Sequence, residues 1–231
     1  VAEKALHQEL METTGITREL TVIMSDIRNF TGISEALSPN QVVALLNEYF
    51  SAMLDVIAHF QISVDKFIGD AIMAVWGAPK GSATDAQKAL TACLEMRKAL
   101  DVLNQKRMER GQPPINIGMG LHAGDAISGT IGSDERMEYT VIGNTVNTGS
   151  RIEASTKAFG TDLLISDDVL AKVGDEFMVE YAGAAEVKGR SDALKLYKVR
   201  GYKDASGTMV EVKTPYSDYQ AEKVDKVKIA S

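Results

Sequence analysis

The sequence predicts an α+β domain in which a mostly antiparallel sheet is flanked by helices. Apolar runs with strand character occur in two pairs, at 62–76 and 115–131, and a short Gly-Asp connection typical of a hairpin interrupts each pair. Segments with helical spacing lie between these pairs, so strands and helices are mixed without strict alternation. Hairpins place neighbouring strands antiparallel, and the helices then cover the sheet.

In the first half of the chain, local residue signals mark where several predicted elements start or end. The apolar run Val22–Met24 indicates a buried strand, and Ser38 followed by Pro39 is typical of a helix start. Gly111 ends a long apolar-striped helix. The predicted elements are a helix within 1–12, a strand over 19–25, a loop over 25–32, a helix over 38–60, strands over 62–68 and 71–76, and a helix over 84–110.

The second half predicts shorter elements. Gly124 and Asp125 separate two apolar runs and are interpreted as the turn of a second hairpin. The predicted elements are strands over 115–123, 126–131 and 138–142, a helix over 144–157, a strand over 163–165, a helix over 167–173, and strands over 177–188 and 193–199. The polar residues 201–231 are interpreted as a C-terminal tail or linker with little core of its own. We therefore expect an N-terminal helical linker over 1–18 and one domain over 19–200.

The composition limits what this protein can bind. Its 231 residues suffice for one larger domain, and 45% of them are hydrophobic, as in soluble globular proteins. A net charge of −7 gives no general attraction for nucleic acid or an anionic membrane. A polyanionic ligand therefore needs a local cluster of cations or a metal ion. The one cysteine, Cys93, lies in an apolar helical stretch and is interpreted as a buried residue in a reducing compartment.

Two carboxylates stand where predicted strands meet loops. Asp26 follows the first buried strand, and Asp70 sits at the tip of the first hairpin. Mg²⁺ commonly takes one or two carboxylates and leaves its other positions to water and phosphate, so the pair could hold metal. Most Asp residues at strand ends are turn formers, and spacing alone favours that simpler interpretation.

Candidate residues for binding the sugar and phosphate of a nucleotide occur later in the chain. Asn147 and Arg151 are four residues apart and share one face of a predicted helix, which suits the sugar and phosphate of a nucleotide as well as a solvated surface. Lys188 lies in a flexible basic segment, where taken alone it is a surface charge. The sequence contains no Gly-rich phosphate loop of the common types, so a nucleotide would need another cradle.

Four segments, taken together, resemble the motifs of one enzyme family, the class III nucleotidyl cyclases. Residues 21–31 (TVIMSDIRNFT) and 65–77 (DKFIGDAIMAVWG) resemble its two metal-binding motifs. Residues 139–151 (YTVIGNTVNTGSR) resemble the purine and transition-state motif, and 187–189 (VKG) match the late phosphate-binding lysine. The four segments occur in the same order as in the family and together span about residues 20–200, which makes the resemblance very specific. The resemblance is to class III adenylyl cyclase catalytic domains of a bacterial subset, and it implies the family's ferredoxin-like palm fold.

The resemblance also implies a reaction and an assembly. ATP would be converted to 3′,5′-cyclic AMP and pyrophosphate by attack of the ribose 3′-hydroxyl on the α-phosphate, with two-metal-ion catalysis by Mg²⁺ or Mn²⁺. The metal residues would be Asp26, Ile27 and Asp70; the nucleotide-binding residues Lys66, Thr140, Ile27, Phe30 and Thr31; and the catalytic residues Asn147, Arg151 and Lys188. In this family the metal-binding and base-reading halves of one site come from different subunits, so a head-to-tail homodimer with composite sites is implied.

Two residues bear on the choice of base. Lys66 can donate to N1 of adenine and the Thr140 oxygen can accept from N6, whereas guanine reverses this pattern. Guanylyl cyclases of the family typically carry Glu and Cys at these positions, so the pair favours ATP. Two residues depart from the common pattern: Thr140 replaces Asp, and Asn29 replaces Gly. Asn tolerates left-handed backbone better than most residues, so we expect the loop around Asn29 to keep its shape.

Three alternative functions fit this sequence less well. A guanylyl or promiscuous cyclase is disfavoured by Lys66. A catalytically silent regulatory module would have lost a metal Asp or the Asn147–Arg151 pair, which are present. A diguanylate cyclase needs a different hairpin tip from Gly69-Asp70. We expect a cytoplasmic domain in a longer parent protein with an upstream sensor or regulatory domain; attachment of that parent to a membrane is left open.

Overall fold

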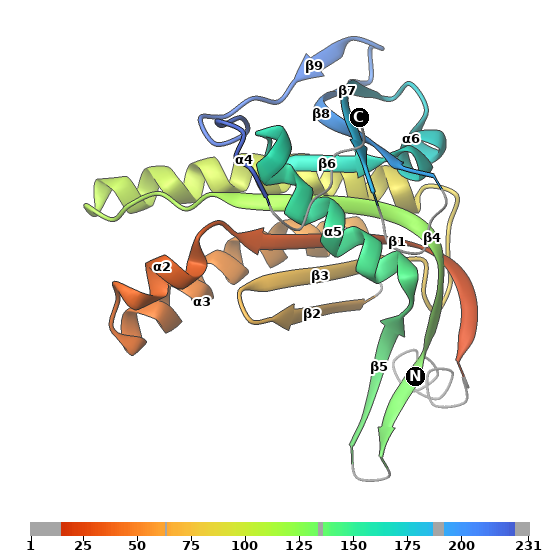
Figure 1. Ribbon diagram of the computed structural model, residues 1–231, viewed down its shortest axis with the longest axis horizontal. Helices are drawn as coiled ribbons and strands as arrows, with labels where there is room; N and C mark the ends of the chain where they lie inside the picture. The colour runs from red at the N-terminus through yellow and green to blue at the C-terminus, as the bar shows by residue number, and fades with distance from the viewer. Residues whose placement is uncertain (1–14, 63, 134–135, 187–191, 225–231) are drawn as a thin grey trace.

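A single mixed sheet organises the fold in the computed structural model (Figure 1). The structure describes residues 15–62, 64–133, 136–186 and 192–224. The strands run in the order β2-β3-β1-β4-β6-β8-β7, with β5 paired to β4 and β9 paired to β8. Their bounds are β1 Ile16–Ile27, β2 Val64–Ile68, β3 Ala71–Trp76, β4 Ile117–Ser133, β5 Arg136–Ile142, β6 Leu163–Ser166, β7 Phe177–Ala185, β8 Leu194–Lys203 and β9 Met209–Glu211. Only the β4–β6 pairing is parallel within this described sheet, so the predicted α+β class with a mostly antiparallel sheet is confirmed.

Helices cover both faces of this sheet. Their bounds are α2 Phe30–Glu35, α3 Pro39–Ile57, a 3₁₀ turn Ala58–Phe60, α4 Asp85–Glu109, α5 Asn144–Phe159 and α6 Asp167–Val173. Side chains alternate along a strand, so Ile23 of β1 packs with α3 and α4, whereas Val22 and Met24 pack with Val146 of α5. The predicted start of α3 is confirmed: Ser38 and Gln41 form a reciprocal capping box ahead of the first turn.

One strand replaces the second predicted hairpin. β4 runs without a turn through Gly124 and Asp125, which pair with Leu20 and Glu19 of β1. This position favours glycine, because an added Cβ on Gly124 would lie 2.9 Å from the Thr145 hydroxyl. The turn prediction was therefore wrong because the ladder with β1 supplies the backbone hydrogen bonds that a turn would have lost. The hairpin partner of β4 is β5.

Residues after 201 are built into the domain. β8 continues to Lys203, β9 adds a further strand, and Val212 and Ser217 are buried. Backbone hydrogen bonds and buried Arg97 fasten the polar segment 204–224 to the domain, and within it Val212 and Ser217 alone are buried. At the other end, residues 16–18 belong to β1 and not to a helical linker. The predicted helix within 1–12 lies outside the described residues.

The core contains two residues useful as reporters. Trp76, the one tryptophan of the chain, is fully buried, and its indole Nε1 donates to the Phe60 carbonyl at 2.6 Å. Cys93 is fully buried in α4, as predicted, and desolvation raises the pKa of its thiol. Among the described helices, Pro39–Phe60 alone is long and apolar enough to cross a bilayer, by length and composition. In this helix, four residues are buried in the core: Leu45, Tyr49, Met53 and Ile57.

Candidate active site

Two carboxylates meet at one end of the central strands. Asp26 is the penultimate residue of β1, and Asp70 lies in the β2–β3 turn, where Gly69 takes a positive φ of 64°. The Ile27 amide donates to Asp70 Oδ2 at 3.3 Å, which holds the turn against the end of β1. Burial, and then the adjacent carboxyl of Asp70, raise the pKa of Asp26 to about 7.

This carboxylate pair fits a divalent cation. Asp26 Oδ1 is buried and has no hydrogen-bond partner among the described residues. Like charges this close favour protonation of one group unless a cation neutralises them. The described residues contain no group of three or more His, Cys, Asp or Glu that could form an all-protein cage. A site with two carboxylates would therefore leave most coordination positions to water and substrate, as Mg²⁺ sites often do.

The loop after the pair adopts the backbone expected from its sequence. Asn29 has φ 53° and ψ 34°, in the left-handed region, so Asn takes the conformation of the more usual Gly. The predicted loop is shorter than expected, because α2 begins at Phe30. Phe30 packs against the core, whereas Thr31 is exposed. The first turn of α2 therefore follows Asp26 closely in the sequence.

A second constellation joins β2 to β5. Lys66 Nζ donates to Thr140 Oγ1 at 2.8 Å, although the two residues lie 74 positions apart. The same ammonium pairs with Glu138 Oε1 at 3.1 Å. Sequence reasoning named Lys66 and Thr140 but missed Glu138, which alternation along β5 places on the same face as Thr140. Lys66 therefore has an acceptor and a counter-ion ready before any ligand binds.

Helix α5 carries the predicted pair Asn147 and Arg151 on its exposed face. Thr145 anchors its first turn, with Oγ1 donating to the Asp125 carbonyl at 2.6 Å. Ile152 on the opposite face is buried against the sheet. Lys188, the third predicted catalytic residue, lies outside the described residues.

A cluster behind the carboxylates was not predicted. Arg28 Nη1 pairs with Glu153 Oε1 of α5 at 3.2 Å, and Arg28 Nη2 donates to the Tyr219 hydroxyl at 2.9 Å. Burial raises the pKa of Glu153, and the Arg28 guanidinium opposes that shift. The partners lie 125 and 191 residues from Arg28, so no local pattern signals the cluster.

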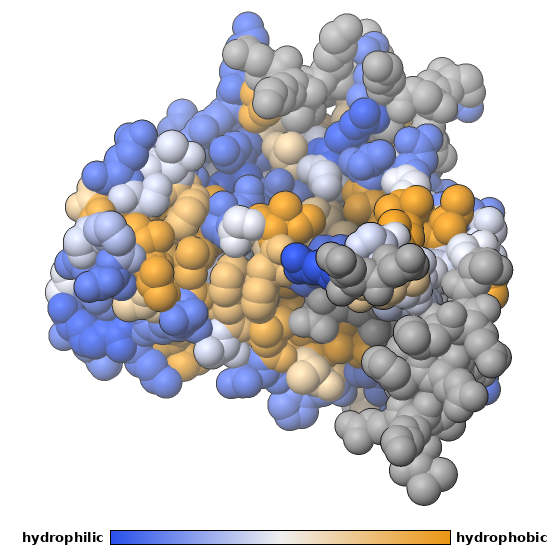
Figure 2. Space-filling model, turned by 90° about the horizontal axis from the view of Figure 1, so that it is seen from below, coloured by the Kyte–Doolittle hydropathy of each residue, from blue (hydrophilic) through white to orange (hydrophobic). Residues whose placement is uncertain are grey.

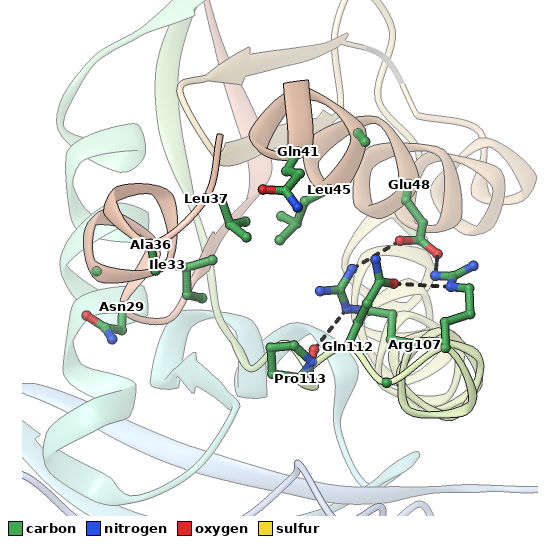
Figure 3. A pocket seen from close by; sticks show the side chains of 14 residues that line it. Asn29, Ile33, Ala36, Leu37, Gln41, Leu45, Glu48, Arg107, Gln112 and Pro113 are labelled. Atoms are coloured by element: carbon green, nitrogen blue, oxygen red, sulfur yellow. Dashed lines mark hydrogen bonds and ion pairs between the residues drawn. The ribbon is translucent and has the colours of Figure 1, made fainter. Parts of the chain in front are cut away.

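A pocket of about 680 Å³ lies beside this site between α2, α3 and the end of α4. Figure 3 shows Ile33, Leu37 and Leu45 on its apolar side and Glu48 with Arg107 at its polar end. Arg107 Nη1 donates to Glu48 Oε2 at 3.1 Å, so these charges satisfy each other. Neither the carboxylate pair nor the Lys66 constellation lines the pocket, which therefore is not the candidate active site.

The sequence matches a known family and named relatives. Residues 13–201 match the family described as the adenylate and guanylate cyclase catalytic domain. The chain is 38% identical over 191 residues to "Adenylate cyclase 1" of Rhizobium meliloti, covering 83% of this chain and 29% of the relative. It is 37% identical over 191 residues to "Adenylate cyclase" of Anabaena cylindrica, covering 80% of this chain and 37% of the relative. The chain thus spans about a third of the length of these relatives.

Solved structures share the fold. The adenylyl cyclase CyaB from P. aeruginosa superposes with a TM-score of 0.75 at 35% identity, covering 81% of this chain and 96% of that chain. The guanylyl cyclase Cya2 superposes with a TM-score of 0.77 at 34% identity, covering 87% of this chain and 100% of that chain. Similar backbones therefore accompany both base specificities, so the backbone alone does not identify the nucleotide.

Proposed function

The chain belongs to the adenylate and guanylate cyclase catalytic domain family, and on that premise we propose that it converts ATP to 3′,5′-cyclic AMP and pyrophosphate. The observation that carries the choice of ATP is the contact of Lys66 Nζ with Thr140 Oγ1 at 2.8 Å. Lys66 is a donor only, and Thr140 offers lone pairs, so together they complement N1 and N6 of adenine. Guanine would face Lys66 with a donor, and each polar group left unpaired in the closed complex would cost about 1–3 kcal/mol.

Adenine would have to displace Glu138 from Lys66 in order to bind. Its carboxylate already pairs with Lys66, and its side chain is 57% exposed. An exposed ion pair is worth little, so adenine can displace it at small cost. While the site is empty, the pair holds the ammonium close to Thr140.

The chemistry needs positioning more than covalent work by the protein. Bound Mg²⁺ or Mn²⁺ would supply Lewis-acid activation of the 3′-hydroxyl and charge neutralisation for the departing pyrophosphate. Asp26 and Asp70, with the Ile27 carbonyl, would hold these ions, and the first turn of α2 at Phe30 and Thr31 would cradle the triphosphate. This assignment is supported by the unpartnered, buried Asp26 Oδ1.

The remaining roles concern orientation and charge. Asn147 would orient the ribose by hydrogen bonding, and Arg151 would neutralise charge that develops on the phosphates. Lys188 would supply a second cation to the same phosphates. The exposure of Asn147 and Arg151 on α5 supports a role toward a ligand outside their own subunit.

We further propose a head-to-tail homodimer with two composite sites. Exposed large apolar side chains recur on β2, β4 and β5: Phe67, Ile68, Ile127, Ile131, Met137 and Ile142. Figure 2 shows apolar side chains gathered on the face seen from below, the side where β2 and β5 lie in Figure 1. Such a surface favours burial against a second copy. Because one chain carries both half-sites, a symmetric pair would complete two active sites.

The test is to measure cyclic nucleotide formed from ATP or GTP, with Mn²⁺ or Mg²⁺, across a range of protein concentrations. We expect cyclic AMP, a specific activity that rises with concentration, and its loss in Asp70→Ala. Lys172→Ala is a matched control, because its ion pair with Glu19 lies on an exposed edge away from the site residues. Cyclic GMP as the main product, or no product at any concentration, would contradict the proposal. An upstream sensor and a cytoplasmic location of this domain stay part of the proposal.

A further inference from the structure

One side chain of the C-terminal segment reaches the metal-binding end of β1. Tyr219 Oη accepts a hydrogen bond from Arg28 Nη2 at 2.9 Å and donates one to the Thr161 carbonyl at 2.5 Å. The hydroxyl therefore uses its single proton on Thr161 and a lone pair on Arg28. The guanidinium carbon also lies 5.7 Å from the centre of the Tyr219 ring. Two kinds of contact thus fix Arg28, which follows Asp26 by two residues.

The segment that carries Tyr219 is fastened along its length. The Tyr219 amide donates to the Gly160 carbonyl at 3.1 Å, and the Glu222 amide donates to the Lys157 carbonyl at 3.0 Å. Upstream, Arg97 Nη1 donates to the Val212 carbonyl at 2.7 Å. Because Gly160 and Lys157 close helix α5, the segment is attached to the same helix that carries Asn147 and Arg151.

Two glycines make this arrangement sterically possible. A Cβ on Gly118 of β4 would lie 2.2 Å from Arg28 Nη2 and 2.4 Å from Glu153 Oε1. A Cβ on Gly160 would lie 2.4 Å from the Tyr219 carbonyl oxygen. The backbone therefore leaves room for the ion pair at one place and for the C-terminal segment at the other.

We propose that Tyr219 is a positioning residue for the cation site, an inference that rests on the proposed function. It holds the Arg28 guanidinium against Glu153, so that the end of β1 and helix α5 keep one relative position. Gly118 pairs with Asp26 in the β1–β4 ladder, and a Cβ on Gly118 would meet Arg28, so a released Arg28 could turn toward Asp26 and compete with the cations for its carboxylate. Residues outside the matched family region 13–201 thus belong to the catalytic apparatus.

Tyr219→Phe tests this role because it removes only the hydroxyl. Mn²⁺ alone is titrated into nucleotide-free protein and free Mn²⁺ is followed by electron paramagnetic resonance; kcat and KM for ATP are measured in parallel. We expect the Mn²⁺ Kd to rise about tenfold, as for other residues that orient metal ligands. We expect kcat to fall about tenfold while KM changes less, since Tyr219 touches no substrate. Tm should fall by at most about 4 °C.

Tyr181→Phe is the matched control, because Tyr181 is 57% exposed on β7 and the same atom is removed. Combining Tyr219→Phe with Arg28→Lys completes a double-mutant cycle, in which the proposal requires non-additive effects on the Mn²⁺ Kd. A Tyr219→Phe protein with wild-type Mn²⁺ affinity and kcat, or additive effects in the cycle, would overturn the proposal. A wild-type chain that forms no cyclic nucleotide would count against the proposed function, and the Mn²⁺ titration would still decide the role of Tyr219.

Discussion

Gly118→Ala adds one methyl group where the Arg28–Glu153 ion pair crosses β4. In an open strand this substitution would be mildly favourable, by up to about 1 kcal/mol. Here the new Cβ would lie 2.2 and 2.4 Å from the ends of the two charged side chains, so at least one of them must move and the ion pair must open. Overpacking costs about 1–3 kcal/mol. Separating the pair, whose side chains are each 12% exposed, adds about 1.5–3 kcal/mol for the lost charged hydrogen bond. We therefore expect a net destabilisation of about 3 kcal/mol.

Urea unfolding followed by Trp76 fluorescence measures this change, because that side chain is fully buried and is the one tryptophan of the chain. All variants need the same protein concentration, since a dimer gains stability with concentration. Gly81→Ala is the control: its nearest neighbours would be 3.5 Å from the new Cβ, so a change within about 0.5 kcal/mol is expected. A Gly118→Ala protein as stable as wild type would refute the account of the cluster as rigid and tightly packed.

Three further predictions concern the site itself. Lys66→Glu should lower kcat/KM for ATP by at least about 100-fold, because adenine N1 then faces an acceptor; chromatographic product analysis with ATP and GTP checks this, and retained ATP activity would contradict the assigned role. Mixing inactive Asp70→Ala and Arg151→Ala chains should restore about a quarter of wild-type activity, because about half of randomly formed dimers are mixed and each holds one intact site; no recovery after verified subunit exchange would contradict composite sites. The pKa of Asp26 is raised to about 7 from 3.8, so between these pH values the folded chain binds more protons than the unfolded chain, and the stability of the metal-free protein should fall as pH rises from about 4 to 7. The stabilisation by Mn²⁺ should increase over the same pH range. A Mn²⁺ effect on thermal unfolding that does not depend on pH would refute this prediction.

Elements with local signals were predictable. Ser38, Pro39 and Gly111 mark helix ends by their own conformational preferences, and the structure uses them in that way. The helix over 167–173 agrees residue for residue with α6 because Ser166 caps it locally. The turn at Gly124 failed because a residue type common in turns also serves a strand where a helix approaches closely, and only the packing of α5 distinguishes the two cases.

In the candidate site, too, residues with a local sequence signal were predictable and residues joined by long-range contacts were not. Asp26, Asp70, Lys66 and Thr140 lie in contiguous motifs, so a resemblance could name them before any coordinates. Contacts across more than a hundred residues leave no such signal, which is why Glu153 and its partners were missed. The polar composition after residue 201 gives no sign of how that segment is attached, because hydrogen bonds to backbone and buried Arg97 hold it and hydrophobicity does not report such contacts.

Cys93 gives this chain a practical property for observing motion. The thiol is fully buried and its pKa is raised, so alkylating and fluorescent reagents should leave it unmodified in the native protein. A cysteine introduced at Val43, which is 57% exposed on α3, would then be the single reactive thiol of each subunit. Donor and acceptor dyes placed there on two populations of chains would report subunit exchange and any reorientation of α3 on nucleotide binding by energy transfer, without removal of a native residue from the core.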